Sequence, residues 1–462
     1  VTSCVLLISL FFYSKEFSNW VSSEFSSRMN SVERLFLGKY LTYPARWVWI
    51  NIVPGVSVTV LLLLVLYAAG EIYFRSTLPF NQPYWPSKFD ERVGFTFSPD
   101  ATVNWTNYLD YWTSTRVNSL GFLDREPPLP GNAPDACRVV FIGDSMLEAA
   151  QVPIKEKMHI QFEQLANNSL SFIQPVETIA FGYAGSGQVN QLPFYDVFAE
   201  PLKPDVVVLI FVNNDFGNNS TTLESIRNGW HPLHPPRLFF EYDARSNAFT
   251  SIPIDPDWQS YLLSPIPSVE PNVADSTSWL SKHSYFYNQL YNNFFVNSPR
   301  LSSFLTGTPS ISEIYESRLA EVKTINGYAE DFGDWDPAII GIDNVFLEDD
   351  MPPAFEEAVL TTGYALDQFK ERSERDNFEL IIMVNYGVST LGGDNPNMYN
   401  RIKDLAEVRG IPLVDQYRYM VSKGLGYDDV TFLHDSHMSF IGHQTSAEAL
   451  LEYFRANPNT CK

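Results

Sequence analysis

The chain has 462 residues, 45% hydrophobic and 18% charged, which is enough for a large core and for more than one domain. Its formal net charge of −23 excludes the basic face that nucleic-acid binding needs. An aromatic content of 15% together with 31 prolines favours long ordered loops over disorder.

An uncharged segment at residues 47–70 predicts a transmembrane helix. It reads WVWINIVPGVSVTVLLLLVLYAAG, which is about the length that crosses a bilayer, and it carries Trp47, Trp49 and Tyr67 near its ends, as interfacial aromatics do. Residues 1–13 are also apolar but too short to span, and we interpret them as the end of a truncated first membrane helix. Residues 1–75 therefore form the predicted membrane anchor region.

The residues between the two apolar segments set the predicted orientation. They include Lys15, Arg28, Arg34, Lys39 and Arg46, whereas the chain beyond the second segment is strongly acidic. The positive-inside rule then places residues 14–46 in the cytoplasm and residues from about 71 onward outside it. We expect a membrane-anchored protein whose main domain is extracytoplasmic, either periplasmic or extracellular.

Residues 76–135 are rich in Pro, Trp, Tyr and Asn and show little periodicity, and we interpret them as an extracytoplasmic extension between the anchor and the main domain. The chain has three cysteines, Cys4, Cys137 and Cys461. A disulfide between Cys137 and Cys461 would suit an oxidising compartment. Two unrelated free thiols are an equal alternative, because the sequence does not place their Cα atoms.

After residue 136, apolar runs typical of buried strands alternate with segments of helical periodicity. The predicted strands are 138–142, Val176–Phe181, Pro204–Val212, Phe378–Val384 and Ile411–Val414, and the predicted helices are Met158–Asn167, Gln188–Phe198, Phe355–Glu374, Met398–Arg409 and Gly442–Ala456. Such alternation predicts an α/β domain with a parallel sheet and helices on both faces.

Three successive strands are followed by polar or turn-forming residues. Ser145 follows the first strand in the sequence Gly143-Asp144-Ser145, Gly185 follows the second, and Asn214 the third. All three are expected at the carboxyl edge of the sheet, where open α/β sheets bind ligands. Helix capping after a core strand explains any one of them alone, but it does not explain all three together.

A fourth polar group lies just before the last helix, in His434-Asp435-Ser-His437-Met-Ser-Phe-Ile-Gly442-His443. An Asp and a His this close can form a hydrogen-bonded pair, in which the His accepts a serine proton and the Asp stabilises the imidazolium. The alternative is a polar loop whose side chains cap the last helix.

Together these groups resemble the four blocks of the SGNH hydrolases, also called the GDSL esterase/lipase family, and most closely the membrane-anchored bacterial type. Gly143-Asp144-Ser145 matches the first block, with Met146 where the family name has Leu. Gly185 matches the second block, Asn214-Asp215 the third, and Asp435-Ser-His437 with Gly442-His443 the last. Many members place the Asp three residues before the His, whereas here it is two before.

The resemblance implies a flavodoxin-like three-layer α/β/α domain over residues 136–462. It also implies hydrolysis of an acyl ester, acetyl or short-chain, through an acyl-serine intermediate and without a cofactor. Its implied site residues are Ser145 as nucleophile, His437 as general base, Asp435 as the residue that orients His437, and the N–H groups of Ser145 and Gly185 with the side-chain amide of Asn214 as the oxyanion hole. Asp144 is expected to fix the turn rather than react.

A long insert at about 217–353 separates the third block from the next predicted helix. It is aromatic and acidic, with few regular patterns. A loop this long inside a compact domain is typically functional or a small subdomain. We therefore expect a lid or cap over the site, with Trp230, His231, His234 and Trp258 within reach of the pocket.

Three alternatives remain at this point. The cluster of His434, Asp435, His437 and His443 has ligands that suit Zn²⁺, but no further acidic or Cys cluster completes the set, and we predict no metal. An O-acyltransferase acting on an envelope polysaccharide would use the same Ser-His-Asp site, because a sugar hydroxyl can resolve the acyl-enzyme. A non-catalytic binding protein on this fold is the third. The expected partners are an acyl ester, on a glycan or lipid, and the membrane.

Overall fold

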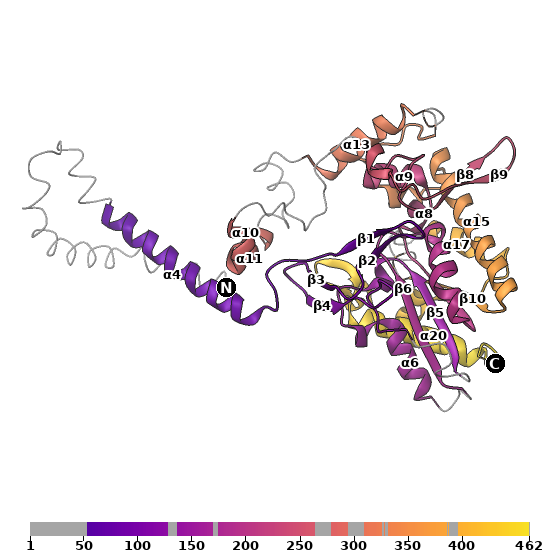
Figure 1. The fold of residues 1–462 in the computed structure, drawn as a ribbon, viewed down its shortest axis with the longest axis horizontal. Helices are drawn as coiled ribbons and strands as arrows, with labels where there is room; N and C mark the ends of the chain where they lie inside the picture. The colour runs from indigo at the N-terminus through magenta and orange to yellow at the C-terminus, as the bar shows by residue number, and fades with distance from the viewer. Residues whose placement is uncertain are drawn as a thin grey trace, which may run out of the picture. The chain divides into compact units, whose positions relative to one another are not determined.

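The computed structural model describes residues 53–127, 136–169, 174–263, 279–293, 309–325, 328, 331–385, 387 and 396–461. The chain separates into two compact units, one of Val1–Leu78 with His283–Asn288 and one of Pro79–Lys282 with Gln289–Lys462. The first unit contains the helix α4, and the second contains the parallel sheet (Figure 1).

Helix α4 spans Val53–Thr77, and its segment Gly55–Thr77 is long and apolar enough to cross a membrane. Residues 1–13 and 47–52 of the predicted anchor lie outside the described part of the chain. The helix continues for about two turns beyond Gly70, the end of the uncharged segment. Glu71 and Arg75 form an ion pair one turn apart, 2.6 Å between their charged atoms, which favours helix there, and the first proline follows at position 79.

A short piece of the insert packs on this helix. The Glu71 carboxylate accepts hydrogen bonds from the Ser284 hydroxyl at 2.9 Å and from the Phe286 N–H at 3.0 Å. The Phe286 ring lies edge-on to the Tyr67 ring, with centroids 5.4 Å apart. Residues 283–288 therefore belong with the membrane helix, whereas other parts of the insert line the pocket described below.

The second unit is built on five parallel strands. They are β5 (Cys137–Gly143), β6 (Val176–Gly182), β7 (Val206–Phe211), β10 (Glu379–Val384) and β11 (Leu413–Asp415). Their order across the sheet is β11-β10-β7-β5-β6, which in chain order is the flavodoxin-like 2-1-3-4-5 arrangement. The predicted fold class is confirmed.

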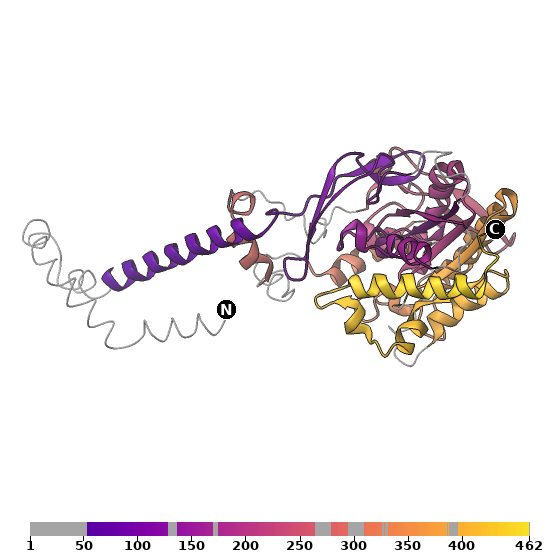
Figure 2. The same ribbon diagram turned by 90° about the horizontal axis from the view of Figure 1, so that it is seen from below.

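Helices cover both faces of this sheet. One layer contains α6 (Met158–Asn167), α18 (Gln416–Ser422) and α20 (Phe440–Ala456), and the other contains α7 (Gln188–Phe194), α15 (Pro353–Asp376) and α17 (Asn397–Glu407). Alternate strand residues point to opposite layers, so Val139 and Phe141 pack in one core and Val140 and Ile142 in the other. The layers are visible in Figure 1 and, after a 90° turn, in Figure 2, where α20 is the long yellow helix.

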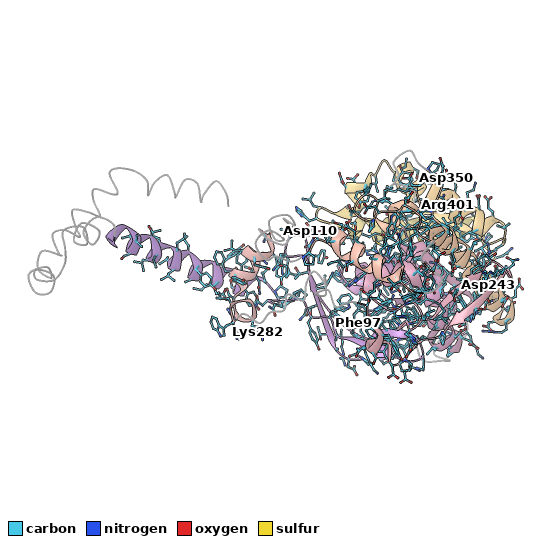
Figure 3. The ribbon with its side chains drawn as sticks, turned by 90° about the horizontal axis from the view of Figure 1, so that it is seen from above. Phe97, Asp110, Asp243, Lys282, Asp350 and Arg401 are labelled. Atoms are coloured by element: carbon cyan, nitrogen blue, oxygen red, sulfur yellow. A yellow bond between two sulfur atoms is a disulfide. The ribbon has the colours of Figure 1, made fainter. Side chains whose placement is uncertain are left out.

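The extension before β5 forms two hairpins that the sequence analysis did not predict. They are β1 (Ser87–Asp90) with β2 (Gly94–Phe97), and β3 (Thr102–Thr106) with β4 (Trp112–Arg116). Phe97, labelled in Figure 3, is fully buried in the same core as α7 and α15. The hairpins have only four or five residues per strand, too short for a clear alternation of polar and apolar residues.

Two long-range contacts tie the extension and the C-terminal residues to the sheet domain. The Asp124 carboxylate, at the end of the extension, bonds to the buried His159 ring at 2.9 Å and accepts from the Ala180 N–H of β6 at 2.9 Å. Cys137, at the start of β5, forms a disulfide with Cys461, with Cα atoms 5.4 Å apart. The structure thus has the disulfide rather than the two free thiols.

The described parts of the insert contain several short elements. They include α8 (Asp215–Asn218), α9 (Thr221–Asn228), the hairpin β8 (Phe239–Asp243) and β9 (Ala248–Ile252), α10 (Trp279–His283), α11 (Tyr285–Tyr291), α13 (Ile311–Val322) and α14 (Ile342–Val345). Val322 and Phe346 are fully buried and extend the core of the α7 and α15 layer, and Phe239 of β8 is fully buried as well. The insert is therefore packed onto the sheet domain over much of its described length.

Candidate active site

The turn that carries Ser145 joins β5 directly to the short helix α5 (Ser145–Glu148). Asp144 caps this helix, because its carboxylate accepts the Met146 N–H at 2.9 Å. Ser145 is the first helical residue, where a backbone N–H has no partner within the helix. The end of β6 lies so close that a Cβ on Gly182 would come within 2.3 Å of the Glu148 nitrogen, so glycine is required there.

The structure brings Ser145, His437 and Asp435 into one hydrogen-bonded chain. The Nε2 atom of His437 lies 2.9 Å from Ser145 Oγ, and its Nδ1 atom lies 2.6 Å from Asp435 Oδ1. Asp435 Oδ1 also accepts the main-chain N–H of His437 at 3.0 Å, which the two-residue spacing permits. Both residues lie on the short strand β13 (Asp435–Met438), paired with β12 (Thr431–Phe432).

The extension contributes two residues to this loop. The Tyr111 hydroxyl, 2.5 Å from Asp435 Oδ2, donates to the carboxylate oxygen that His437 leaves free. Asp110, in the turn between β3 and β4 and labelled in Figure 3, accepts the His434 N–H at 2.9 Å and lies 3.0 Å from its Nδ1. Neither residue could be predicted as part of the site, because each lies 324 positions from its partner and in no motif.

Charges around the triad favour an ionised Asp435. Burial opposes its ionisation, but hydrogen bonds from His437 and Tyr111 outweigh burial and hold the pKa of Asp435 below its ordinary value. Burial likewise lowers the pKa of His437, but the Asp435 carboxylate, with Asp144 and Glu148 further away, raises it above the ordinary value. An anionic Asp435 would stabilise an imidazolium at His437.

Three further acids lie buried beneath the site. Burial raises the pKa of Asp144 and of Asp215, and it raises the pKa of Glu148 to about 8. Asp215 accepts from Gln188 Nε2 at 2.6 Å and from the Val212 N–H at 3.1 Å, so it ties α7 to the end of β7. The Asp215 contacts therefore stabilise the fold around the site.

The predicted oxyanion donors all line the same pocket as Ser145 and His437. Gly185 has φ +66°, in the left-handed region that glycine adopts without strain. Asn214 precedes α8, and its side chain is one of the groups that oppose the rise that burial causes in the pKa of Asp144. The catalytic roles of these residues and of the triad stay predictions.

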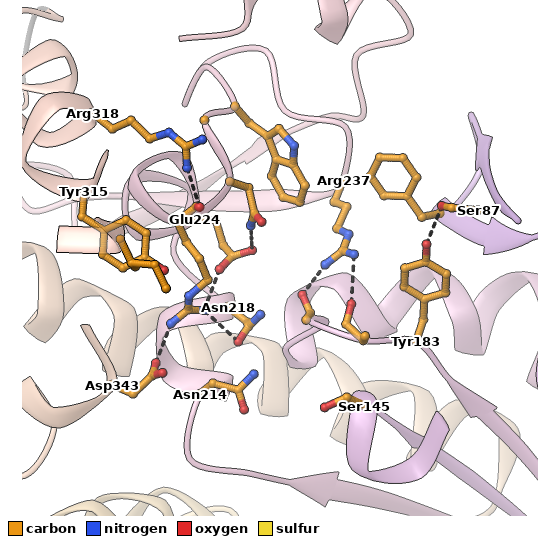
Figure 4. Close-up of a pocket in the computed structure, with 18 of the residues that line it drawn as sticks. Ser87, Ser145, Tyr183, Asn214, Asn218, Glu224, Arg237, Tyr315, Arg318 and Asp343 are labelled. Carbon is orange, nitrogen blue, oxygen red and sulfur yellow. Dashed lines mark hydrogen bonds and ion pairs between the residues drawn. The ribbon is translucent and has the colours of Figure 1, made fainter. Parts of the chain in front are cut away.

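The pocket has a volume of about 820 Å³ and two chemically different sides (Figure 4). One side carries Ser145 and Tyr183, and the aromatic lining residues of the pocket are Trp85, Phe95, Tyr183, Trp230 and Trp258. The far side is charged and polar, formed by Glu224, Arg227, Asn228, Tyr315, Arg318 and Asp343. Most of the far side and both Trp230 and Trp258 come from the insert.

Two insert residues predicted to reach the pocket are absent from its lining. His231 and His234 pair with each other instead, and the His234 ring stacks on Tyr261, with centroids 3.8 Å apart. His234 Nδ1 also lies 2.7 Å from the Asp255 carboxylate. That expectation was wrong, because a tight turn of their own holds both rings outside the pocket.

The histidines of the zinc alternative have separate environments. His434 bonds to Asp110 and His437 to Ser145 and Asp435, whereas His443 is buried in α20 and burial lowers its pKa to about 3. Within the described ranges, no group of three or more His, Cys, Asp or Glu side chains is placed to hold a metal ion.

Comparison with known proteins gives only distant likenesses. No family model and no curated protein matches the chain. Among solved structures, a psychrotrophic esterase from Pseudoalteromonas sp. is 9% identical over 70% of this chain and 99% of its own, with a TM-score of 0.31. An acetylxylan esterase from Geobacillus stearothermophilus is 11% identical over 68% and 92%, with a TM-score of 0.34. A protein of the G-D-S-L family from Desulfitobacterium hafniense DCB-2 is 9% identical over 68% and 98%, with a TM-score of 0.31. At this level of similarity they carry no part of the assignment below.

Proposed function

We propose that this protein is a serine ester hydrolase of the SGNH type that cleaves an acyl ester, acetyl or short-chain, through an acyl-serine intermediate. The observation that carries the proposal is the unbroken chain from Ser145 Oγ through the His437 ring to Asp435, with contacts of 2.9 and 2.6 Å, whose Ser145 and His437 line a pocket. Both contacts have the length of ordinary hydrogen bonds, so the three side chains are already arranged for proton transfer.

The reaction follows from this geometry. His437 Nε2 accepts the Ser145 hydroxyl proton as Oγ bonds to the acyl carbon, and the carbonyl electron pair moves onto its oxygen. The N–H groups of Ser145 and Gly185 and the amide of Asn214 would stabilise that oxyanion. The C–O bond to the alcohol then breaks and His437 returns the proton to the alcohol oxygen. Water repeats the sequence on the acyl-serine, and the acid leaves.

The pocket supports a substrate with a sizeable alcohol part. A volume of about 820 Å³ is far more than an acetyl group occupies. Aromatic rings on one side and paired charges on the other can contact both faces of a polar, ring-containing alcohol such as a sugar. We therefore favour an acylated glycan over an acylated lipid. The same space would admit a sugar hydroxyl as acceptor, which keeps O-acyl transfer as the second candidate function.

We also infer that the domain faces an oxidising compartment outside the cytoplasm. The membrane-length helix α4 and the Cys137–Cys461 disulfide support this location, because disulfides persist in such compartments. Because Cys137 and Cys461 are tied in the disulfide, the test is labelling of a cysteine introduced at the exposed Val408, in sealed cells with and without permeabilisation of the outer layer.

The test of the function is turnover of a short-chain aryl ester by wild-type protein and by Ser145→Ala. We expect the variant to lose turnover and fluorophosphonate labelling while keeping its thermal unfolding midpoint. Equal turnover by Ser145→Ala would refute the mechanism. For the transferase, an acylated donor is supplied with and without an acceptor glycan, and free acid is measured against acyl-glycan.

A further inference from the structure

Arg237 is a buried cation in the pocket wall whose hydrogen bonds go to main-chain carbonyls rather than to a carboxylate. Its residue exposure is 6%, and its guanidinium donates to the carbonyls of Gly185 and, at 3.2 Å, of Ala184 (Figure 4). Three rings surround it, with the guanidinium carbon 5.3 Å from the Trp230 centroid, 5.4 Å from Phe95 and 5.6 Å from Tyr183. Burying an arginine this way is costly unless its charge is used.

Both carbonyls belong to the segment that carries the predicted oxyanion donor. The Ala184 carbonyl and the Gly185 N–H are the two ends of one peptide group, and this peptide is trans. In a planar trans peptide the N–H points opposite to the C=O. A guanidinium fixed on the Ala184 oxygen therefore directs the Gly185 N–H away from itself. The second bond, to the Gly185 carbonyl, fixes the following peptide as well.

The same segment is held from its other side by Glu148. The Ala184 N–H donates to Glu148 Oε2 at 2.8 Å, and Glu148 is the last residue of the helix that begins with Ser145. The nucleophile helix and Arg237 thus clamp three successive peptide groups, 183–184 through Glu148 and 184–185 and 185–186 through Arg237. Gly185 has no side chain to restrict its backbone, and it adopts a left-handed φ here. Contacts from outside the segment are therefore needed to hold it in one conformation.

We propose that Arg237 is a positioning residue that orients and polarises the Ala184–Gly185 peptide for oxyanion stabilisation. A cation on the carbonyl oxygen draws electron density through the amide and strengthens its N–H as a donor. This inference rests on the proposed ester hydrolysis and adds to it a residue of the insert outside the four sequence blocks. The polarised Gly185 N–H gains most when negative charge develops on the oxygen opposite it, that is, in the transition state.

The expected kinetic signature is a loss in kcat with little change in KM. A single oxyanion-hole donor is worth about 100- to 1000-fold in kcat. Loosening one donor without deleting it should cost a part of that, and we expect about 30-fold in Arg237→Met. Affinity for an alkylboronic acid, whose serine adduct carries a tetrahedral oxyanion, should fall by a similar factor, with KM for the aryl ester within about threefold.

Arg237→Lys keeps the charge and the apolar stem but cannot donate to both carbonyls as a planar fork, so it should fall between wild type and Arg237→Met. Arg372→Met is the matched control. Arg372 is a partly buried arginine of the same unit, but it pairs with Asp196 at 2.7 Å and is absent from the pocket lining. It should lower the unfolding midpoint and leave kcat and boronic-acid affinity as in wild type.

If wild type turns over the ester and Ser145→Ala does not, the hydrolase proposal is supported whatever Arg237 does. The hydrolase proposal and the Arg237 proposal can therefore fail separately. A kcat and a boronic-acid affinity within threefold of wild type in folded Arg237→Met would overturn the role of Arg237 alone. A rise in KM with unchanged kcat would also overturn it, because Arg237 would then bind the ground state. If Arg237→Met does not fold, Arg237→Lys carries the same test, with equal kcat as the contrary result.

Discussion

Removing the Tyr111 hydroxyl tests whether the extension takes part in the proposed catalysis. In Tyr111→Phe the Asp435 carboxylate keeps both hydrogen bonds from His437 at Oδ1 and loses the 2.5 Å bond at Oδ2. The ring itself stays, and with it the packing on Phe432, 4.9 Å between centroids. The substitution therefore removes one charge-assisted hydrogen bond and little else.

The size of the effect follows from where Asp435 lies. A hydrogen bond to a charged group contributes about 1.5–3 kcal/mol. The Asp435 side chain keeps 16% of its surface exposed, so water replaces part of the lost bond. We expect a net loss of about 1–2 kcal/mol in transition-state stabilisation, which is about 5- to 30-fold in kcat/KM.

The pH profile distinguishes this role from simple loss of stability. Burial raises the pKa of Asp435, whereas the hydrogen bonds from His437 and Tyr111 lower it. Without Tyr111 the carboxylate is more basic, so it holds the His437 proton more tightly and raises the pKa of His437 further. The acid limb of kcat/KM should therefore move to higher pH, because a base of higher pKa stays protonated over a wider range.

The assay is kcat/KM for a short-chain aryl ester between pH 5 and pH 9, with thermal unfolding recorded on the same samples. Tyr108→Phe is the control, because Tyr108 is buried in the same turn and its hydroxyl bonds to the Asn81 carbonyl at 3.5 Å instead of to the triad. That variant should change stability only. An acid limb and a kcat/KM in Tyr111→Phe that match wild type within twofold would refute the role given to Tyr111.

Three further predictions concern the backbone, the disulfide and a buried histidine. Gly185→Ala forces a side chain into left-handed φ, costing about 1–2 kcal/mol in stability, and should lower kcat at least tenfold if the donor moves; equal kcat would contradict the oxyanion role. Cys137→Ser should lower the free energy of unfolding by about 2–5 kcal/mol under non-reducing conditions, and a reductant should have the same effect on wild type but none on the variant. His443 stays neutral when folded because burial lowers its pKa to about 3, so below pH 6.5 the unfolded chain binds a proton that the folded chain does not. Stability should then fall by up to about 1.4 kcal/mol per pH unit toward pH 3, and His443→Gln should flatten this slope in urea unfolding at pH 5 against pH 7.

The sheet and its helices could be predicted because their signals are local. The run Val206–Phe211 is apolar at every position, as a strand covered on both faces must be, and Met158–Asn167 shows helical periodicity from end to end. The triad could be predicted for a related reason. Ser145 ends a strand, and His437 and Asp435 lie together before a helix, so short segments define the place of each.

The supporting contacts could not be predicted, because each joins residues far apart in the chain. Tyr111 meets Asp435 across 324 positions, and Arg237 meets Gly185 across 52. Neither residue has a neighbour in the sequence that sets it apart from the chain's other tyrosines and arginines. The hairpins of the extension were missed for the complementary reason that they are stabilised by burial on the sheet domain rather than by their own short strands.

The two segments that lie outside the sheet each support a different half of the proposed reaction. The extension holds the proton-transfer side, through Tyr111 on Asp435 and Asp110 on His434, and the insert holds the oxyanion side, through Arg237 on the Ala184–Gly185 peptide. A bare sheet domain would carry the nucleophile turn at Ser145 but would lack the partners that fix its acid–base pair and its donor. Defects in the extension should therefore appear in the pH profile, and defects in the insert should appear in kcat and transition-state affinity. Tyr111 and Arg237 share no hydrogen-bond partner, because one contacts Asp435 and the other the Ala184 and Gly185 carbonyls. The double variant Tyr111→Phe with Arg237→Lys should therefore show nearly additive losses in log kcat/KM.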